Sequence, residues 1–143
     1  MDGLSGREED HEMKELTDDI AAATRKEAKF RKRRDNAART LMKSGYTSKE
    51  LAAPITVQHS RIRQYVSAGE FDDQYVSVKD FVEAFESWQA VNARLNRLKE
   101  VRNRAIIDRL DQGDRQVDVA ADFGISQFLV SHIVNTKQEE SLL

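Results

Sequence analysis

Cysteine is absent from the 143 residues, which excludes disulfide bonds and thiolate metal sites and fits a reducing cytoplasm. Proline occurs once and glycine six times, so few positions force a turn and long helices are favoured. No apolar run approaches the roughly 18 residues that a membrane span needs. The first twelve residues, MDGLSGREEDHE, are acidic and lack the apolar region of a signal peptide. We therefore expect a helical cytoplasmic protein with no membrane segment.

The chain has little net charge, since 23 Lys and Arg nearly balance 25 Asp and Glu to give −2, but the two signs are strongly segregated. Acids dominate 1–20 and 70–87, whereas bases dominate 25–43 and 94–109. A phosphate backbone responds to such local basic stretches and not to the sum over the chain. The alternative is a solvated helix face with ion pairs four residues apart. We favour contact with the DNA backbone, and the candidates are Arg31, Lys32, Arg33, Arg34, Arg39, Lys43, Arg102, Arg104 and Lys137.

The most informative stretch, QVDVAADFGISQFLVSHIVN at 116–135, predicts two short helices joined by a tight turn. Gly124 can end the first helix because glycine enters left-handed backbone space without a steric penalty. Ser126 is a good N-cap for the second helix. Apolar residues three and four positions apart mark the buried faces: Val119, Ala120 and Phe123, then Val130, Ile133 and Val134.

This pattern resembles the DNA-binding helix-turn-helix, with a small alanine at the helix crossing and a glycine in the turn. A second such motif is expected at 51–66, LAAPITVQHSRIRQYV, after a capping box formed by Thr47 and Glu50. It is less typical, because Thr56 stands where the turn glycine usually is and Pro54 removes a hydrogen-bond donor. We therefore expect altered local geometry with the same topology.

The two motifs belong to a repeat with a constant offset of 68 residues. Each repeat is predicted to consist of a long basic helix, a glycine and then the two short helices. The aligned pairs are Phe30/Leu98, Arg34/Arg102, Ala37/Ala105, Met42/Leu110, Gly45/Gly113, Ala52/Ala120, Ile55/Phe123, Val57/Ile125, Ile62/Val130 and Tyr65/Ile133. Both repeats resemble small bacterial and phage DNA-binding regulators, in which a charged helix with an R-x-x-A-x-x-x-L-like run leads into the motif. That resemblance implies binding to double-stranded DNA.

Apolar residues with near 3–4 spacing predict a long helix over about 8–44, with Glu27 as a polar interruption of a coiled-coil-like seam. This seam can pair with its own copy in a homodimer or fold against a second long helix that starts at Ser77. The second helix has an aromatic stripe that we interpret as core. The expected fold is all-α, with two repeated units of long helix plus helix-turn-helix. The segments are 1–10 (flexible, acidic), 11–66 (first unit), 67–76 (linker), 77–137 (second unit) and 138–143 (tail).

In a helix-turn-helix the second helix enters the major groove, and its outward side chains reach base edges. The first unit offers Arg and Gln, which can pair bidentately with guanine and adenine. In the second unit Phe128 and Leu129 fall on or beside the groove-facing side, which favours a protein partner or added core there. The base-edge candidates are Gln58, His59, Ser60, Arg61 and Arg63, then Ser126, Gln127, Ser131 and His132.

Catalysis has little support, because His11, His59 and His132 have no metal-ligand spacing and no phosphate-binding or nucleotide-binding motif occurs. We expect neither enzyme activity, nor a cofactor, nor a metal. The leading hypothesis is a nucleoid-associated, sequence-specific transcriptional regulator of phage or bacterial type. The alternatives are an adaptor that binds proteins through the long helices and Phe128/Leu129, and an architectural or segregation protein that coats DNA without sequence preference.

Overall fold

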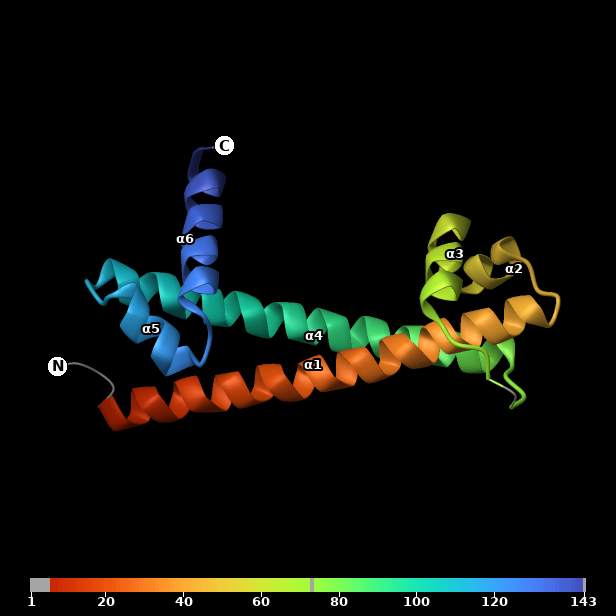
Figure 1. Cartoon of the computed structure of the whole chain (residues 1–143), viewed down its shortest axis with the longest axis horizontal. Coiled ribbons are helices and arrows are strands. Elements are labelled where there is room, and N and C mark those ends of the chain that lie inside the picture. The colour runs from red at the N-terminus through yellow and green to blue at the C-terminus, as the bar shows by residue number, and fades with distance from the viewer. Residues whose placement is uncertain (1–5, 73, 143) are drawn as a thin grey trace. The chain divides into compact units, whose positions relative to one another are not determined.

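The computed structural model describes residues 6–72 and 74–142, and every regular element in them is helical. This confirms the predicted all-α class (Figure 1). The elements are α1 (Gly6–Lys43), α2 (Ser48–Ala52), the 3-10 turn η1 (Ala53–Ile55), α3 (His59–Ala68), α4 (Val78–Asp111), α5 (Gln116–Phe123) and α6 (Gln127–Leu142).

The long helices α1 and α4 pack together, so the seam predicted on α1 is covered within the chain. Glu27, the polar residue in that seam, has a specific partner on α4. The indole N–H of Trp88 donates to its carboxylate at 2.9 Å, and Arg31 lies 3.7 Å from the other carboxylate oxygen. The interruption therefore fixes the register of the two helices, because the hydrogen bond forms in only one alignment.

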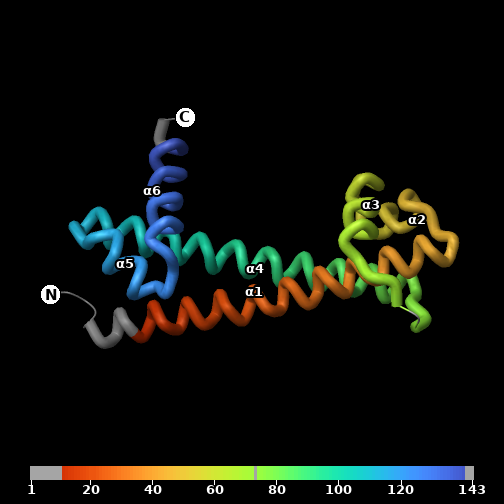
Figure 2. The backbone as a smooth tube through the Cα atoms, viewed as in Figure 1, coloured from red at the N-terminus to blue at the C-terminus, as the bar shows by residue number. Residues whose placement is uncertain are grey.

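The chain divides into two compact units. The central unit is 23–94, and the terminal unit combines 1–22 with 95–143. Each unit contains part of α1, part of α4 and one pair of short helices (Figures 1 and 2). The long helices thus contribute to both units, and each unit is built from segments that are far apart in the sequence.

In the central unit, α2 and α3 pack on the C-terminal part of α1 and the N-terminal part of α4. Leu51 and Ile62 are fully buried between them, as is Phe81 of α4. Burying a large apolar side chain contributes roughly 1.5–3 kcal/mol, so this cluster holds the short helices in place. The buried cluster is Ala37, Ala38, Leu41, Leu51, Ala52, Ile62, Tyr65, Phe81 and Phe85.

In the terminal unit, α5 and α6 pack on the C-terminal part of α4 and the N-terminal part of α1. The Thr17 hydroxyl of α1 donates to the Phe123 carbonyl at 3.3 Å, which ties α1 to the end of α5. The buried cluster is smaller than that of the central unit and consists of Ile106, Val119, Ala120, Phe123, Val130 and Ile133. Met13 and Leu16 pack against it and are only partly buried.

The repeat is visible in how the helices end. At Gly45 and at Gly113 the chain enters the left-handed region, with φ of 113° and 102°. In both cases the amide of the glycine and that of the next residue bond back to the last turn, as in Gly45 N to Met42 O (3.1 Å) and Gly113 N to Leu110 O (3.0 Å). The two glycines are 68 positions apart, so identical helix stops precede both pairs of short helices.

Candidate nucleic-acid interface

The first helical pair comprises α2, η1 and α3. Its start is the predicted capping box, since the Thr47 hydroxyl accepts from the Glu50 amide and the Glu50 carboxylate accepts from the Thr47 amide, each at 3.2 Å. Pro54 lies in η1, and Thr56 takes the left-handed conformation with φ of 55°. The expected change in local geometry is therefore a 3-10 ending of the first helix, with threonine in the place of the turn glycine.

The outer face of α3 is polar and exposed because Ile62 and Tyr65 on its inner face anchor it to the core. Within the described part of the chain, neither Arg61 nor Arg63 forms an ion pair. All five base-edge candidates on this unit are exposed: Gln58, His59, Ser60, Arg61 and Arg63.

Gln64 is an exposed residue of the same outer face that the sequence interpretation missed. It follows Ser60 by four positions, so the two side chains lie one above the other along α3. The signal that identifies it is the helical period counted outward from Ile62, which places Gln64 opposite the buried stripe. A Gln beside two Arg extends the set of groups that can pair with base edges.

The second helical pair comprises α5 and α6, whose axes bend by 112° at the intervening turn. Gly124 has φ of 66°, and the Ile125 amide bonds to the Ala120 carbonyl at 3.0 Å. Ser126 caps α6 as predicted, because its hydroxyl accepts from the Leu129 amide at 3.0 Å. A bend of this size lies within the roughly 90–120° that is typical of the helix-turn-helix.

The outer face of α6 differs from that of α3. Phe128 is 82% exposed, whereas Leu129 is half-buried against the core of the terminal unit. The Ser131 hydroxyl donates to Gln116 on α5 at 2.7 Å and is therefore engaged within the pair. The exposed polar candidates on this face are Ser126, Gln127 and His132, with Lys137 exposed further along α6.

Among the residues predicted to contact the DNA backbone, Arg34 is the one that is buried in the structure. Its guanidinium stacks on the rings of Tyr65 (3.8 Å) and Trp88 (4.3 Å) and lies 2.8 Å from the Asp35 carboxylate. Only 5% of the residue is exposed. A charge in this position cannot reach a phosphate group, so its role is structural. Burial raises the pKa of Asp35, against the lowering effect of Arg34.

The equivalent residue in the terminal unit, Arg102, has a similar geometry. Its guanidinium donates to the Asn103 side-chain oxygen at 3.1 and 3.2 Å, and burial lowers its pKa. In both repeats the arginine thus donates to the side chain of the next residue, which is the carboxylate of Asp35 in one case and the amide of Asn103 in the other. Arg102 is half-buried, which leaves Arg104 as the exposed candidate of this pair.

Several other basic candidates on α1 have partners. Arg33 lies over the Phe30 ring at 5.5 Å, and Lys43 lies over Phe71 at 4.1 Å. Arg39 donates to the carbonyls of Val66 (3.5 Å) and Gly69 (3.1 Å), which caps the C-terminal end of α3. These side chains remain exposed, as do those of Arg31 and Lys32, so contact with a backbone stays a prediction for them.

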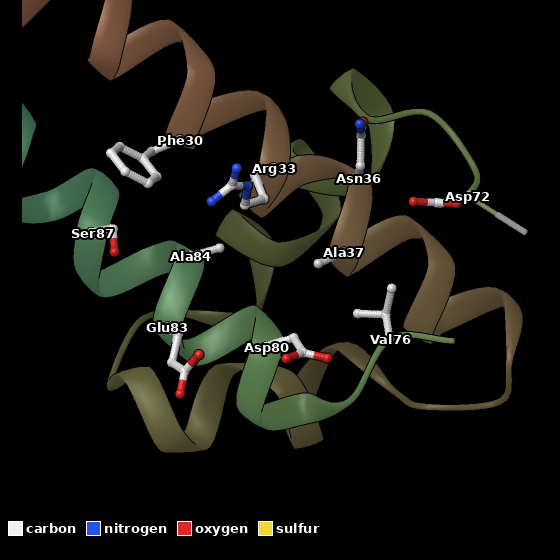
Figure 3. Close-up of a pocket in the computed structure, with 10 residues that line it drawn as sticks. All are labelled: Phe30, Arg33, Asn36, Ala37, Asp72, Val76, Asp80, Glu83, Ala84 and Ser87. Carbon is white, nitrogen blue, oxygen red and sulfur yellow. The ribbon is translucent and has the colours of Figure 1, made fainter. Parts of the chain in front are cut away.

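A cavity of about 400 Å³ opens between α1 and α4 in the central unit (Figure 3). Arg33 of α1 points into it, opposite Asp80 and Glu83 of α4. Asp80 also caps the start of α4, since its carboxylate accepts from the Ser77 amide at 2.9 Å and this bond lowers the pKa of Asp80. The segment after α3 forms one side of the cavity through Asp72 and Val76.

Comparison with protein-family models, with curated proteins and with solved structures gave no match. In the described part of the chain, no three His, Cys, Asp or Glu side chains are grouped so that they could hold a metal ion. No single helix there has the length and apolar composition of a membrane span; α5 and α6 meet that test only as a bent pair.

Proposed function

We propose that this protein binds double-stranded DNA in a sequence-specific manner and acts as a transcriptional regulator. In this proposal both helical pairs are helix-turn-helix motifs, and α3 is the principal helix that enters a major groove. The observation that carries the proposal is the outer face of α3, where Gln64 is exposed at the centre and Arg61 and Arg63 are exposed on its two flanks, on a firmly anchored helix. Arg and Gln are the side chains best suited to reading guanine and adenine edges.

The geometry of the pairs supports the same conclusion. A recognition helix must project its outer face while its inner face is held by the rest of the domain. In α3 this support comes from Ile62 and Tyr65, and Arg39 fixes the end of the helix from α1. Exposed basic residues on α1, such as Lys32, supply positive charge that can pair with the phosphate backbone of DNA.

The role of the second helical pair is different in this proposal. Phe128 occupies the position equivalent to Ser60, at the centre of the outer face, and 82% of it is exposed. An aromatic ring there suits contact with a thymine methyl group or with a protein, and it offers no hydrogen bond to a base. Binding of a protein through α6 is the second candidate function that this observation favours.

Selection from a random DNA duplex pool with the full chain tests the proposal. We expect one enriched motif, bound roughly 10³-fold more tightly than a scrambled duplex at physiological salt. The Arg61→Ala/Arg63→Ala variant should lose the preference for the motif, because each bidentate contact contributes about 1–3 kcal/mol of discrimination. The matched control is Arg94→Ala/Arg97→Ala, which removes two exposed arginines of α4 and should retain the preference.

Three other outcomes contradict the proposal in distinguishable ways. Strong, salt-sensitive binding without an enriched motif indicates an architectural protein. Absence of DNA binding indicates an adaptor. An enriched motif that Arg61→Ala/Arg63→Ala binds as well as the wild-type chain does would move recognition away from α3. A footprint that covers two successive major grooves per chain would assign DNA contact to both helical pairs.

A further inference from the structure

A second groove lies in the terminal unit, on the face where α1 and α4 meet, and encloses about 550 Å³. Its floor is apolar and is formed by Met13 and Leu16 of α1 with Val101 of α4. Val101 is 54% exposed. The described residues of α6 do not line this groove.

This groove is the repeat equivalent of the cavity in the central unit. At an offset of 68 residues, Glu12 and Glu15 correspond to Asp80 and Glu83, and Val101 corresponds to Arg33. Equivalent positions of the two repeats therefore line the cavity of the central unit and the groove of the terminal unit. The two differ in which described residues cover them.

In the central unit the chain itself covers the hollow. After α3 the backbone runs back along α1 in extended form, and the Glu70 amide donates to the Asn36 side chain at 2.7 Å. The Asp72 amide donates to the Thr40 hydroxyl at 3.1 Å, and Val76 packs against the core. Figure 3 shows Asp72 and Val76 on this segment beside Asn36 and Ala37 of α1. We call residues 69–77 the covering segment.

The terminal unit has no such cover among its described residues. The position equivalent to Ala68, where α3 ends, is Thr136, and there α6 continues as a helix to Leu142. The residue equivalent to Thr40, which accepts the backbone amide in the central unit, is the exposed Asp108. A hydrogen-bond acceptor is thus retained at the point where an extended chain would dock.

The charge around the open groove is acidic. Glu12, Glu15, Asp19 and Asp108 line it, and the one cation in the lining, Arg109, is paired at 2.7 Å with both Asp114 and Asp122. In the central unit the covering segment is acidic and contacts basic residues of α1, since Arg39 donates to the Gly69 carbonyl and Lys43 lies over the Phe71 ring. Complementarity of charge selects the partner of a surface and speeds its association.

We propose that the groove of the terminal unit binds an extended, basic segment of a partner protein that carries an apolar anchor residue. The anchor occupies the place of Val76, on Met13, Leu16 and Val101. A backbone amide of the segment donates to Asp108, and its Lys or Arg side chains pair with Glu12 and Glu15. The acidic lining repels phosphate, so this surface is separate from the DNA-binding face and does not depend on it.

A defined probe follows from the covering segment itself. The probe is a labelled peptide with the sequence of residues 69–77 in which the three acids are replaced by lysine, and the control peptide keeps the native sequence. Fluorescence anisotropy with the full chain at low salt should show binding of the basic peptide at least tenfold tighter than binding of the native one. Binding should weaken as salt is raised.

Two variants locate the site. Val101→Arg introduces the residue that already stands at the equivalent position of the central unit. This change should weaken binding of the basic peptide at least tenfold. Glu12→Lys/Glu15→Lys should do the same. The matched control Glu139→Lys/Glu140→Lys makes the same change of charge on exposed positions of α6, outside the groove, and should bind as the wild-type chain does. Circular dichroism confirms that each variant retains its helix content.

The proposal is overturned if the basic peptide does not bind, if the native peptide binds equally well, or if Val101→Arg leaves the affinity unchanged. Sedimentation of the chain alone measures its self-association and tests whether a second copy occupies the groove. Self-association that Val101→Arg abolishes would make a second copy of this chain the occupant in place of a partner protein.

Discussion

The first and second helical pairs have the same register but are completed differently. α3 is 10 residues long, ends at Ala68 and is tied to α1 by Arg39 and by the close approach of Gly69. α6 is 16 residues long and continues past the equivalent position. The first pair therefore presents a short polar helix fixed at both ends, whereas the second presents a longer helix with Phe128 exposed. Repetition of a backbone pattern does not bring repetition of surface chemistry.

The largest expected effect distinguishes the buried Arg34 from its half-buried repeat equivalent, Arg102. Arg34→Met leaves the Asp35 carboxylate buried without its partner, which typically costs about 3–5 kcal/mol of unfolding free energy. Arg102→Met leaves only the neutral Asn103 without its donor, and should cost about 1 kcal/mol. Urea denaturation followed by circular dichroism measures both. Equal losses would show that the two arginines have the same structural role.

The next effect concerns the end of α3. A Cβ atom at Gly69 would lie 2.2 Å from the backbone oxygen of Asp35, so Gly69→Ala must displace α3 or α1 and should cost about 3 kcal/mol. The matched control is Gly45→Ala, where a Cβ meets nothing within 4 Å and only the positive φ is unfavourable. That change should cost about 1 kcal/mol. The fluorescence of Trp88, the single tryptophan, reports unfolding of the central unit.

An exchange at the centres of the two outer faces tests the proposed division of roles. Ser60→Phe should weaken binding to the selected duplex about tenfold, because a ring displaces polar side chains from the groove. Phe128→Ser should change that affinity less than twofold. Anisotropy titrations at fixed salt measure both variants. If Phe128→Ser instead causes the larger loss, α6 and not α3 is the principal DNA-binding helix.

The turns offer a smaller comparison. Thr56 and Gly124 both adopt positive φ, but only glycine does so without steric cost. Thr56→Gly should therefore raise the free energy of unfolding by up to about 1 kcal/mol, and Gly124→Thr should lower it by about 1–2 kcal/mol. Thermal denaturation of the two variants compares them directly. A loss of stability in Thr56→Gly would assign the threonine side chain a packing role.

The smallest effect is a dependence on pH. Because burial raises the pKa of Asp35, the folded state holds this proton at pH values where the unfolded chain has released it. The stability of the wild-type chain should therefore fall, relative to Asp35→Asn, as the pH rises from about 3.8 through the raised pKa. Asp35→Asn also reproduces the Arg102–Asn103 arrangement. A wild-type stability that rises relative to the variant over this range would contradict the assignment.

Local sequence patterns predicted most of the helices because their signals act within a few residues. The capping box of Thr47, the stop at Gly45 and the turn at Gly124 depend on backbone geometry and neighbouring side chains only. Part of the outer face of α3 followed from the helical period. Gln64 belongs to the same helical period but lies in the second turn of α3, beyond the residues at the start of the helix that were predicted to reach base edges.

The burial of Arg34 could not be predicted from the sequence. Four consecutive bases indicate a solvated cationic surface, and nothing local shows that Tyr65 and Trp88, 31 and 54 positions away, enclose one of them. The same limit applies to Ser131, whose partner Gln116 lies on the preceding helix. Side chains on one basic stretch thus have different roles according to which distant residues approach them.

The sequence alone determined the all-α class, the helix ends and the common register of the two repeats, because these depend on interactions between near neighbours. Only the tertiary structure decided how the long helices divide between two units, which arginine is buried and which hollow the described residues of 69–77 cover. Those outcomes depend on contacts between residues far apart in the chain. The covering segment illustrates the difference. After α3 the chain continues as a non-helical segment along α1, whereas at the equivalent position α6 continues as helix.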